Sequence, residues 1–161
     1  MLVEFSSYIA HEFRNSIGAI IGMARLVEKC KEPASNMQGH SFRNNVRGQT
    51  PEDWPKALYY RYWMHMAHHD NPAHYGIRTQ DHKLIFFYGL PLDASGALPD
   101  PTPAGWELYD LRKDPEELKS VYNDPEYKDV VEDLKRRLLE MKKELGDEDE
   151  RYPEMMALWD Q

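Results

Sequence analysis

Apolar residues recur at intervals of three and four along the first thirty residues of the chain. This spacing is the period of one face of an α-helix and predicts a single amphipathic helix over residues 1–32. The residues that form the apolar face are Phe5, Ile9, Phe13, Ile17, Ile20, Ile21, Ala24 and Val27. Pro33 ends the pattern, and we interpret residues 33–36 as a linker to a second unit.

The hydrophobic pattern changes after residue 56. Four short segments rich in aromatic or branched residues predict β-strands at 57–64, 74–79, 82–88 and 106–111. Asn71-Pro72 and the Gly/Pro-rich stretch 89–105 separate them. Four short strands at this spacing favour an antiparallel sheet.

The helical period returns after the last strand. Asp114-Pro115 and Asp124-Pro125 each place a capping carboxylate before a proline, which predicts two helix starts. After the second start, one apolar face runs to Gly146 and includes Tyr127, Val130, Val131, Leu134, Leu138, Met141 and Leu145. We expect this helix to cover one face of the sheet, so the predicted fold class is α+β.

Residues 147–161 form an acidic tail. Asp147 to Glu150 are expected to fray from the domain. Tyr152, Met155, Met156 and Trp159 could instead dock back as a last turn.

Length and charge narrow the classes of function. The 161 residues fit one domain and a fragment, and 41% hydrophobic residues can build a core. A net charge of −8 without a segregated basic patch argues against nucleic acid as a partner. No segment is apolar enough for a membrane span or a secretory leader, so we expect no membrane partner and a cytoplasmic product. Cys30 is the only cysteine, and it excludes an intrachain disulfide.

Four short motifs follow one another in this part of the chain: His74-Tyr75-Gly76-Ile77-Arg78-Thr79, Lys83-Leu84-Ile85, Trp106-Glu107-Leu108-Tyr109-Asp110-Leu111 and Asp114-Pro115-Glu116-Glu117-Leu118. With these motifs, residues 37–146 resemble the C-terminal subdomain of type I sulfatases, which have an alkaline-phosphatase-like fold and a formylglycine nucleophile. It implies a parent enzyme that is often periplasmic or secreted. It also implies two candidate partners, a sulfatase catalytic domain or a second copy of this chain.

The sequence contains no C/S-x-P-S-R motif, from which sulfatases make their nucleophile. The family's one divalent cation, expected to be calcium, is bound by residues of the catalytic domain. We therefore expect no catalytic residue, no cofactor and no sulfatase activity from this chain alone.

A second resemblance covers residues 5–26. Ala10-His11-Glu12-Phe13-Arg14-Asn15-Ser16-Ile17 is similar to the phosphoacceptor box of sensor histidine kinases, with Ser16 where those kinases usually have proline. It implies that His11 accepts a phosphoryl group and that Glu12 helps to deprotonate it. The alternative function is therefore a helical dimerisation or phosphotransfer fragment, although the chain lacks the kinase's ATP-binding boxes.

Five of the seven histidines fall between His65 and His82. The spacing His65-x-x-His68-His69 invites a zinc interpretation, but a strand would place His68 and His69 on opposite faces, so we predict a polar loop and no metal site.

The sulfatase resemblance implies another role for this region. In that family, loops of the C-terminal subdomain approach the rim of the catalytic cleft, so His69, His74 and Arg78 are candidate substrate-rim residues. Both residue types donate charge-assisted hydrogen bonds to sulfate or carboxylate groups. A further alternative is a weak binder of sulfated or acidic sugars through this loop. The structural alternative is that His74 and Arg78 satisfy sheet-edge carbonyls and pair with Asp81 or Glu107.

Overall fold

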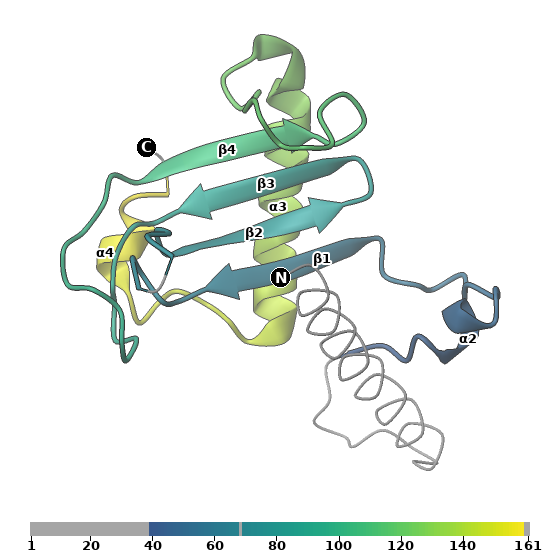
Figure 1. The fold of residues 1–161 in the computed structure, drawn as a ribbon, viewed down its shortest axis with the longest axis horizontal. Helices are drawn as coiled ribbons and strands as arrows, with labels where there is room; N and C mark the ends of the chain where they lie inside the picture. Colours follow the sequence, from purple (N-terminus) through teal and green to yellow (C-terminus); the bar gives the residue numbers. More distant parts are fainter. Residues whose placement is uncertain (1–38, 68, 160–161) are drawn as a thin grey trace, which may run out of the picture. The chain divides into compact units, whose positions relative to one another are not determined.

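A four-stranded antiparallel sheet is the centre of the structure. The computed structural model of the chain describes residues 39–67 and 69–159. The strands are β1 (Ala57–Tyr62), β2 (His74–Thr79), β3 (His82–Phe87) and β4 (Gly105–Asp110), and they lie side by side in chain order (Figure 1). All four predicted strands are present, and each begins and ends within two residues of its expected bounds.

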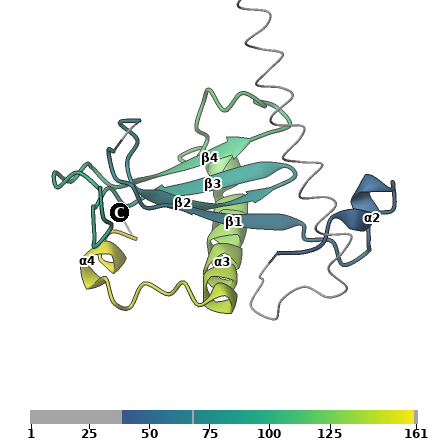
Figure 2. The same ribbon diagram turned by 60° about the horizontal axis from the view of Figure 1, so that its bottom comes forward.

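Helices cover one face of this sheet. The long helix α3 (Lys128–Leu145) follows a short 3-10 helix η1 (Pro125–Tyr127), and the short helix α4 (Pro153–Met156) comes after it. Figure 2 shows α3 and α4 on the same side of the sheet. A further short helix, α2 (Arg43–Val46), precedes β1. The predicted α+β class, a small antiparallel sheet packed against a C-terminal helix, is confirmed.

The helix α3 begins and ends where the sequence predicted. Asp124 accepts a hydrogen bond from the backbone N–H of Glu126 (3.0 Å), and Pro125 occupies the first helical position. At the other end Gly146 adopts a left-handed φ of 67°, and the N–H groups of Gly146 and Asp147 donate to the carbonyls of Lys143 and Lys142. This pair of bonds is a Schellman motif, which satisfies the last carbonyls of the helix.

The helix predicted at Asp114-Pro115 is wrong. The side chain of Asp114 accepts a hydrogen bond from the N–H of Lys119 (2.8 Å), which closes a loop instead of a helical turn. Glu117 then adopts a φ of 57°, a conformation that cannot continue a right-handed helix. The N–H of Val121 donates to Leu108 of β4 (2.8 Å), so the segment returns along the sheet edge.

The core lies between α3 and the sheet. The apolar residues of β2, β3 and β4 that face α3 are buried. They are Tyr75, Ile77, Leu84, Phe86, Trp106 and Leu108 from the sheet, with Leu134 and Leu138 from α3. A fully buried leucine such as Leu138 contributes about 2 kcal/mol through the hydrophobic effect.

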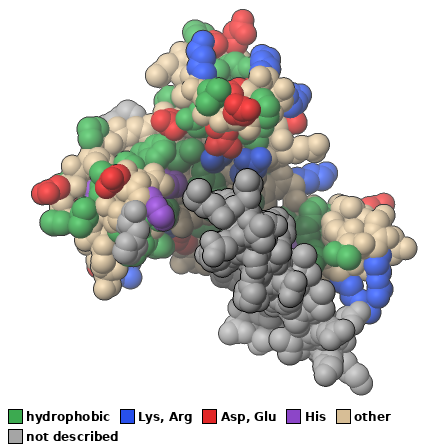
Figure 3. All heavy atoms as spheres, viewed as in Figure 1, with side chains coloured by type: hydrophobic (Ala, Val, Ile, Leu, Met, Phe, Trp, Pro, Cys, Tyr) green, Lys and Arg blue, Asp and Glu red, His purple; other side chains and the backbone are tan. Residues whose placement is uncertain are grey.

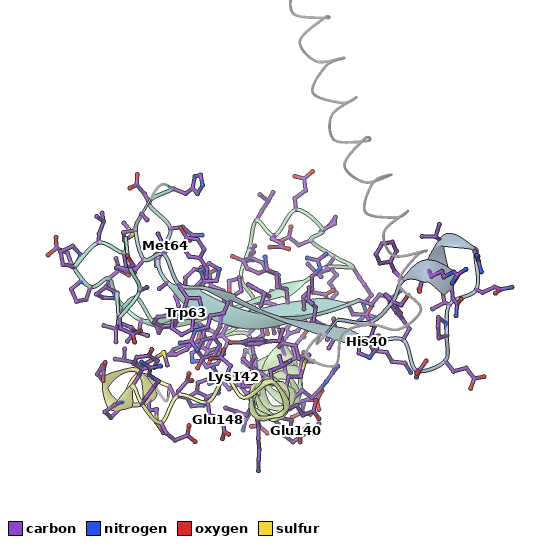
Figure 4. The ribbon with its side chains drawn as sticks, turned by 90° about the horizontal axis from the view of Figure 1, so that it is seen from below. His40, Trp63, Met64, Glu140, Lys142 and Glu148 are labelled. Carbon is purple, nitrogen blue, oxygen red and sulfur yellow. The ribbon has the colours of Figure 1, made fainter. Side chains whose placement is uncertain are left out.

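The segment after α3 is part of this core, so the prediction of fraying at Asp147–Glu150 is wrong. Asp147 and Asp149 pair with Arg61 (2.7 and 3.2 Å) and with Lys142 (3.8 and 3.0 Å), whose side chains are almost fully buried. Tyr152 and Met155 are buried, as the alternative of a docked last turn required, whereas Met156 is 50% exposed. In Figure 4 Lys142 lies between α3 and the sheet, whereas Glu140 and Glu148 lie on the outer side of the helical layer.

Several predictions concern residues outside the described part of the chain. These are the amphipathic helix 1–32, the linker 33–36, and the phosphoacceptor pair His11 and Glu12. Within residues 39–67 and 69–159, no helix is both long and apolar enough to cross a membrane.

Candidate functional site

The face of the sheet opposite α3, called here the open face, carries the candidate substrate-rim residues His74 and Arg78. The strand register arranges its side chains in three cross-strand rows. The rows are Leu58, Arg78, Lys83 and Tyr109; then Tyr60, Gly76, Ile85 and Glu107; and last Tyr62, His74, Phe87 and Gly105. Most of these residues are only partly buried, although four of them are aromatic.

His74 lies in the third row within an aromatic cluster. Its ring lies 5.4 Å from that of Tyr62 in a stacked arrangement and 5.0 Å from that of Phe87. The Nδ1–H donates to the carbonyl of Pro72 (2.7 Å), which places the proton on Nδ1 and leaves Nε2 as an acceptor in the neutral ring. Burial lowers the pKa of His74, and the charge of Lys83 lowers it further. At neutral pH the ring is therefore uncharged and suited to accept a hydrogen bond.

Arg78 lies at the other end of the same strand, with a carboxylate already bound. Its Nη1 donates to Glu117 (3.0 Å), and the same carboxylate also accepts from Lys83, the cross-strand neighbour of Arg78. The predicted partners, Asp81 and Glu107, are thus replaced by a residue from the loop after β4. Charged side chains of both signs gather at the top of Figure 3, where that loop lies. Because Arg78 is half exposed, this pair contributes about 0–1 kcal/mol.

The three candidate substrate-rim residues do not converge on one point. His74 and Arg78 are four residues apart on one strand, which corresponds to about 13 Å. His69 is exposed in the loop between β1 and β2. Of the three, His74 adjoins a concave surface formed by described residues.

That surface is a shallow depression of about 500 Å³ at the end of the sheet. Its lining comes from the loop before β2, the end of β3, and the start of β4 with the loop before it; the residues are Asn71, Pro72, Phe87, Thr102, Pro103, Gly105, Trp106 and Glu107. It adjoins His74 through Pro72, which accepts the imidazole proton, and through Phe87, which contacts the ring. The ring of Phe87 lies there beside the amide of Asn71 and the carboxylate of Glu107, whereas the ring of Trp106 packs in the core on Phe86 and Trp159.

The residues of the depression were not predicted as a site. Asn71-Pro72 and the Gly/Pro-rich loop indicated only breaks between strands, although loops of that kind often carry binding residues. Glu107 was considered only as a partner of His74 or Arg78. Its carboxylate instead accepts a hydrogen bond from the hydroxyl of Tyr109 (2.7 Å).

The histidine-rich loop contains no metal-binding cluster in the described residues. No three His, Cys, Asp or Glu side chains in residues 39–67 and 69–159 are placed to hold an ion. His65 is fully buried and uses both ring nitrogens on backbone groups. The described residues therefore do not fit the divalent cation that the sulfatase resemblance implies.

Comparison with known families agrees with this architecture. The family described as N-sulphoglucosamine sulphohydrolase, C-terminal, matches residues 19–144, which is most of the chain. The match begins inside the segment 5–26, whose resemblance to histidine kinases stays a prediction.

Individual relatives are sulfatases. The N-acetylglucosamine-6-O-sulfatase of Bacteroides thetaiotaomicron is 38% identical over 120 residues, which are 73% of this chain and 19% of that enzyme. A solved protein in complex with its substrate D-glucosamine-2-N,6-O-disulfate is also 38% identical, with a TM-score of 0.61 over 73% of this chain and 22% of that one. A 2-O GAG sulfatase, 21% identical over 74% of this chain and 23% of its own, shares the fold with a TM-score of 0.51.

This chain therefore spans about a fifth of the length of the relatives that it matches. It contains the sheet and the covering helix of the C-terminal subdomain. The chain belongs to the C-terminal domain family of the sulfatases.

Proposed function

We propose that this chain is a non-catalytic C-terminal sulfatase subdomain that completes a catalytic domain and is inactive alone. The family membership carries this proposal. The sequence offers no C/S-x-P-S-R motif, and its described residues hold no metal cluster, so a covalent sulfate intermediate has no group on which to form here. The contribution of the subdomain is then to bind and position.

The open face is the surface proposed to contact the catalytic domain. Among the described elements, α3 and α4 cover the opposite face, whereas the open face presents aromatic rows to another domain. Leu58 in its first row is 62% exposed. Contact with a second domain would remove this side chain from water.

The depression beside His74 is proposed to reach the sulfated substrate. The Nε2 of His74 is a free acceptor among the described contacts and can accept from a sugar hydroxyl, and the depression offers the ring of Phe87 and polar groups. A relative that is 38% identical was solved with D-glucosamine-2-N,6-O-disulfate as its substrate, which favours a sulfated glucosamine as the sugar class. His69 remains a candidate contact at the end of the exposed loop.

A mixing experiment tests the proposal. The purified chain is analysed by size exclusion with light scattering, alone and with a same-genome sulfatase catalytic domain truncated before its own C-terminal subdomain. We expect a 1:1 complex, aryl-sulfate turnover only in the mixture, and none from this chain alone. Turnover by the pure chain would refute the non-catalytic role, and failure to form a complex would refute the docking role.

Two matched variants locate the contact surface. Leu58→Glu places a charge on the open face and should abolish the complex. Leu139→Glu places the same charge on the outer side of α3, where the leucine is 48% exposed, and should leave the complex unchanged. Equal effects of the two substitutions would place the interface elsewhere.

A further inference from the structure

His65 is a fully buried polar residue whose ring joins two loops of the structure. Its Nδ1 accepts a hydrogen bond from the N–H of Ala73 (3.1 Å), and its Nε2 donates to the carbonyl of Asp100 (3.0 Å). Its own carbonyl accepts from the N–H of Leu98 (2.9 Å). Because an N–H points at Nδ1, the ring is held as the neutral tautomer with its proton on Nε2.

The two loops are the walls of the depression at the end of the sheet. Asn71 and Pro72 immediately precede Ala73, and Thr102 and Pro103 follow Asp100 by two and three residues. The imidazole of His65 therefore connects the backbone next to one wall with the backbone next to the other. None of the atoms of His65 lines the depression.

Backbone strain is concentrated in the same two loops. Three of the four non-glycine residues with positive φ in the described chain lie there: Met66 (52°), Asp70 (48°) and Leu92 (46°). Such conformations cost free energy and persist only where the surroundings hold them. The bond from the N–H of Met66 to the carbonyl of Asn71 (2.9 Å) closes the first loop, and the His65 ring ties it to the second.

We propose that His65 is a positioning residue that sets the separation of the two walls of the depression. It acts through Ala73 and Asp100 and touches no ligand. This inference rests on the proposed function only for the statement that the depression receives the sugar. The positioning itself is a property of the chain alone.

Isosteric substitutions separate the two hydrogen bonds of the ring. In His65→Asn the amide oxygen occupies the place of Nδ1 and can accept from Ala73, whereas the bond to Asp100 is lost. In His65→Gln the longer amide reaches the place of Nε2 and can donate to Asp100, whereas Ala73 loses its acceptor. His65→Ala loses both bonds.

Amide hydrogen exchange measured by NMR on the full chain tests this. We expect the Ala73 N–H to lose protection by about tenfold or more in His65→Gln and His65→Ala but to keep it in His65→Asn. The amides of Leu84 and Phe86 in β3 report the global stability, and their protection should change less than that of Ala73. A long-range nitrogen–proton spectrum should show the proton of His65 on Nε2.

Three results would overturn the inference: a proton on Nδ1, unchanged protection of Ala73 in His65→Gln, or a loss in the β3 amides equal to that at Ala73. The last would make His65 a core residue with no specific effect on the loops. Titration of each variant, in complex with the catalytic domain, with D-glucosamine-2-N,6-O-disulfate then tests the link to binding. Weaker sugar binding that His65→Asn partly rescues supports that link. If exchange follows the prediction but no variant alters sugar binding, the positioning stands and the assignment of the depression to substrate fails.

Discussion

Replacing Asp149 with alanine should be among the most damaging single changes to this fold. The carboxylate accepts hydrogen bonds from Tyr75 (3.0 Å), Arg61 (3.2 Å) and Lys142 (3.0 Å). Asp147 is the second carboxylate of the cluster, so two cations face two anions. The side chains of Arg61 and Lys142 are only 4% and 3% exposed, so water cannot replace a lost partner.

The size of the effect follows from this balance. Burial lowers the pKa of Lys142 even with both carboxylates present, so its charge is already costly. Removing Asp149 leaves two buried cations against the single charge of Asp147. Breaking a buried ion pair from one side costs about 3–5 kcal/mol. The free energy of unfolding of a domain is about 5–15 kcal/mol, so the variant should be close to unfolded.

Urea denaturation followed by tryptophan fluorescence measures the loss. For an m-value of about 2 kcal/mol/M, the midpoint should fall by about 1.5–2.5 M. Glu148→Ala is the matched control, because it removes an exposed carboxylate from the same segment and should shift stability by about 0.5 kcal/mol at most. Adding Lys142→Met to Asp149→Ala should recover part of the loss, since it removes the excess charge. An effect of Asp149→Ala no larger than that of Glu148→Ala would refute the reasoning.

Three further changes test other parts of the fold. Burial raises the pKa of Asp147, but hydrogen bonds and nearby cations outweigh burial, so the net pKa is lowered. The stabilisation by Asp147 is therefore present above about pH 4 and is lost as the pH falls through the lowered pKa. In urea midpoints measured from pH 7 to pH 2, Asp147→Asn should reduce the loss of stability at acid pH. Gly89→Ala puts a side chain at a φ of 61° against the carbonyl of Thr102 and should lower the free energy of unfolding, measured by urea denaturation, by about 2 kcal/mol or more. Gly105→Ala meets no atom within 4 Å and should be nearly neutral, so similar losses in the two variants would contradict the packing argument. Trp159→Ala removes an indole whose ring centroid lies 4.6 Å from that of Trp106 and 5.5 Å from that of Phe86. By calorimetry the variant should have a lower melting enthalpy and a free energy of unfolding lower by about 3 kcal/mol. An unchanged thermal transition would show that the C-terminal segment is dispensable.

The local elements were predictable because short-range chemistry specifies them. Aromatic and branched residues along 74–79 and 82–88 indicated strands, and a two-residue turn joins the two as an antiparallel hairpin. The cap at Asp124 and the left-handed stop at Gly146 determined α3 almost to the residue. The same reasoning failed at Asp114, where the Val121 to Leu108 hydrogen bond at the sheet edge outweighs the local helix signal.

The candidate site was less predictable because its residues meet only in three dimensions. His74 was identified from its chemistry, but its neighbours Tyr62 and Phe87 come from different strands and are set by the register. Arg78 has Glu117 as its partner through a loop that the sequence indicated as a helix. No residue spacing showed that His65 would bond to Asp100, 35 residues away.

The sequence by itself determined the class of this protein: an antiparallel sheet, a capped covering helix and the motifs of a sulfatase C-terminal subdomain. These follow from periodicity, capping and short motifs, which act over a few residues. Only the tertiary structure decided that the acidic segment 147–150 packs against the domain. Its charges indicated exposure to solvent. However, Arg61 and Lys142 are buried between the sheet and α3, and each of these cations needs an anionic partner there. The cost of an unpaired buried charge is set by the whole fold, so it cannot be read from any local stretch of sequence.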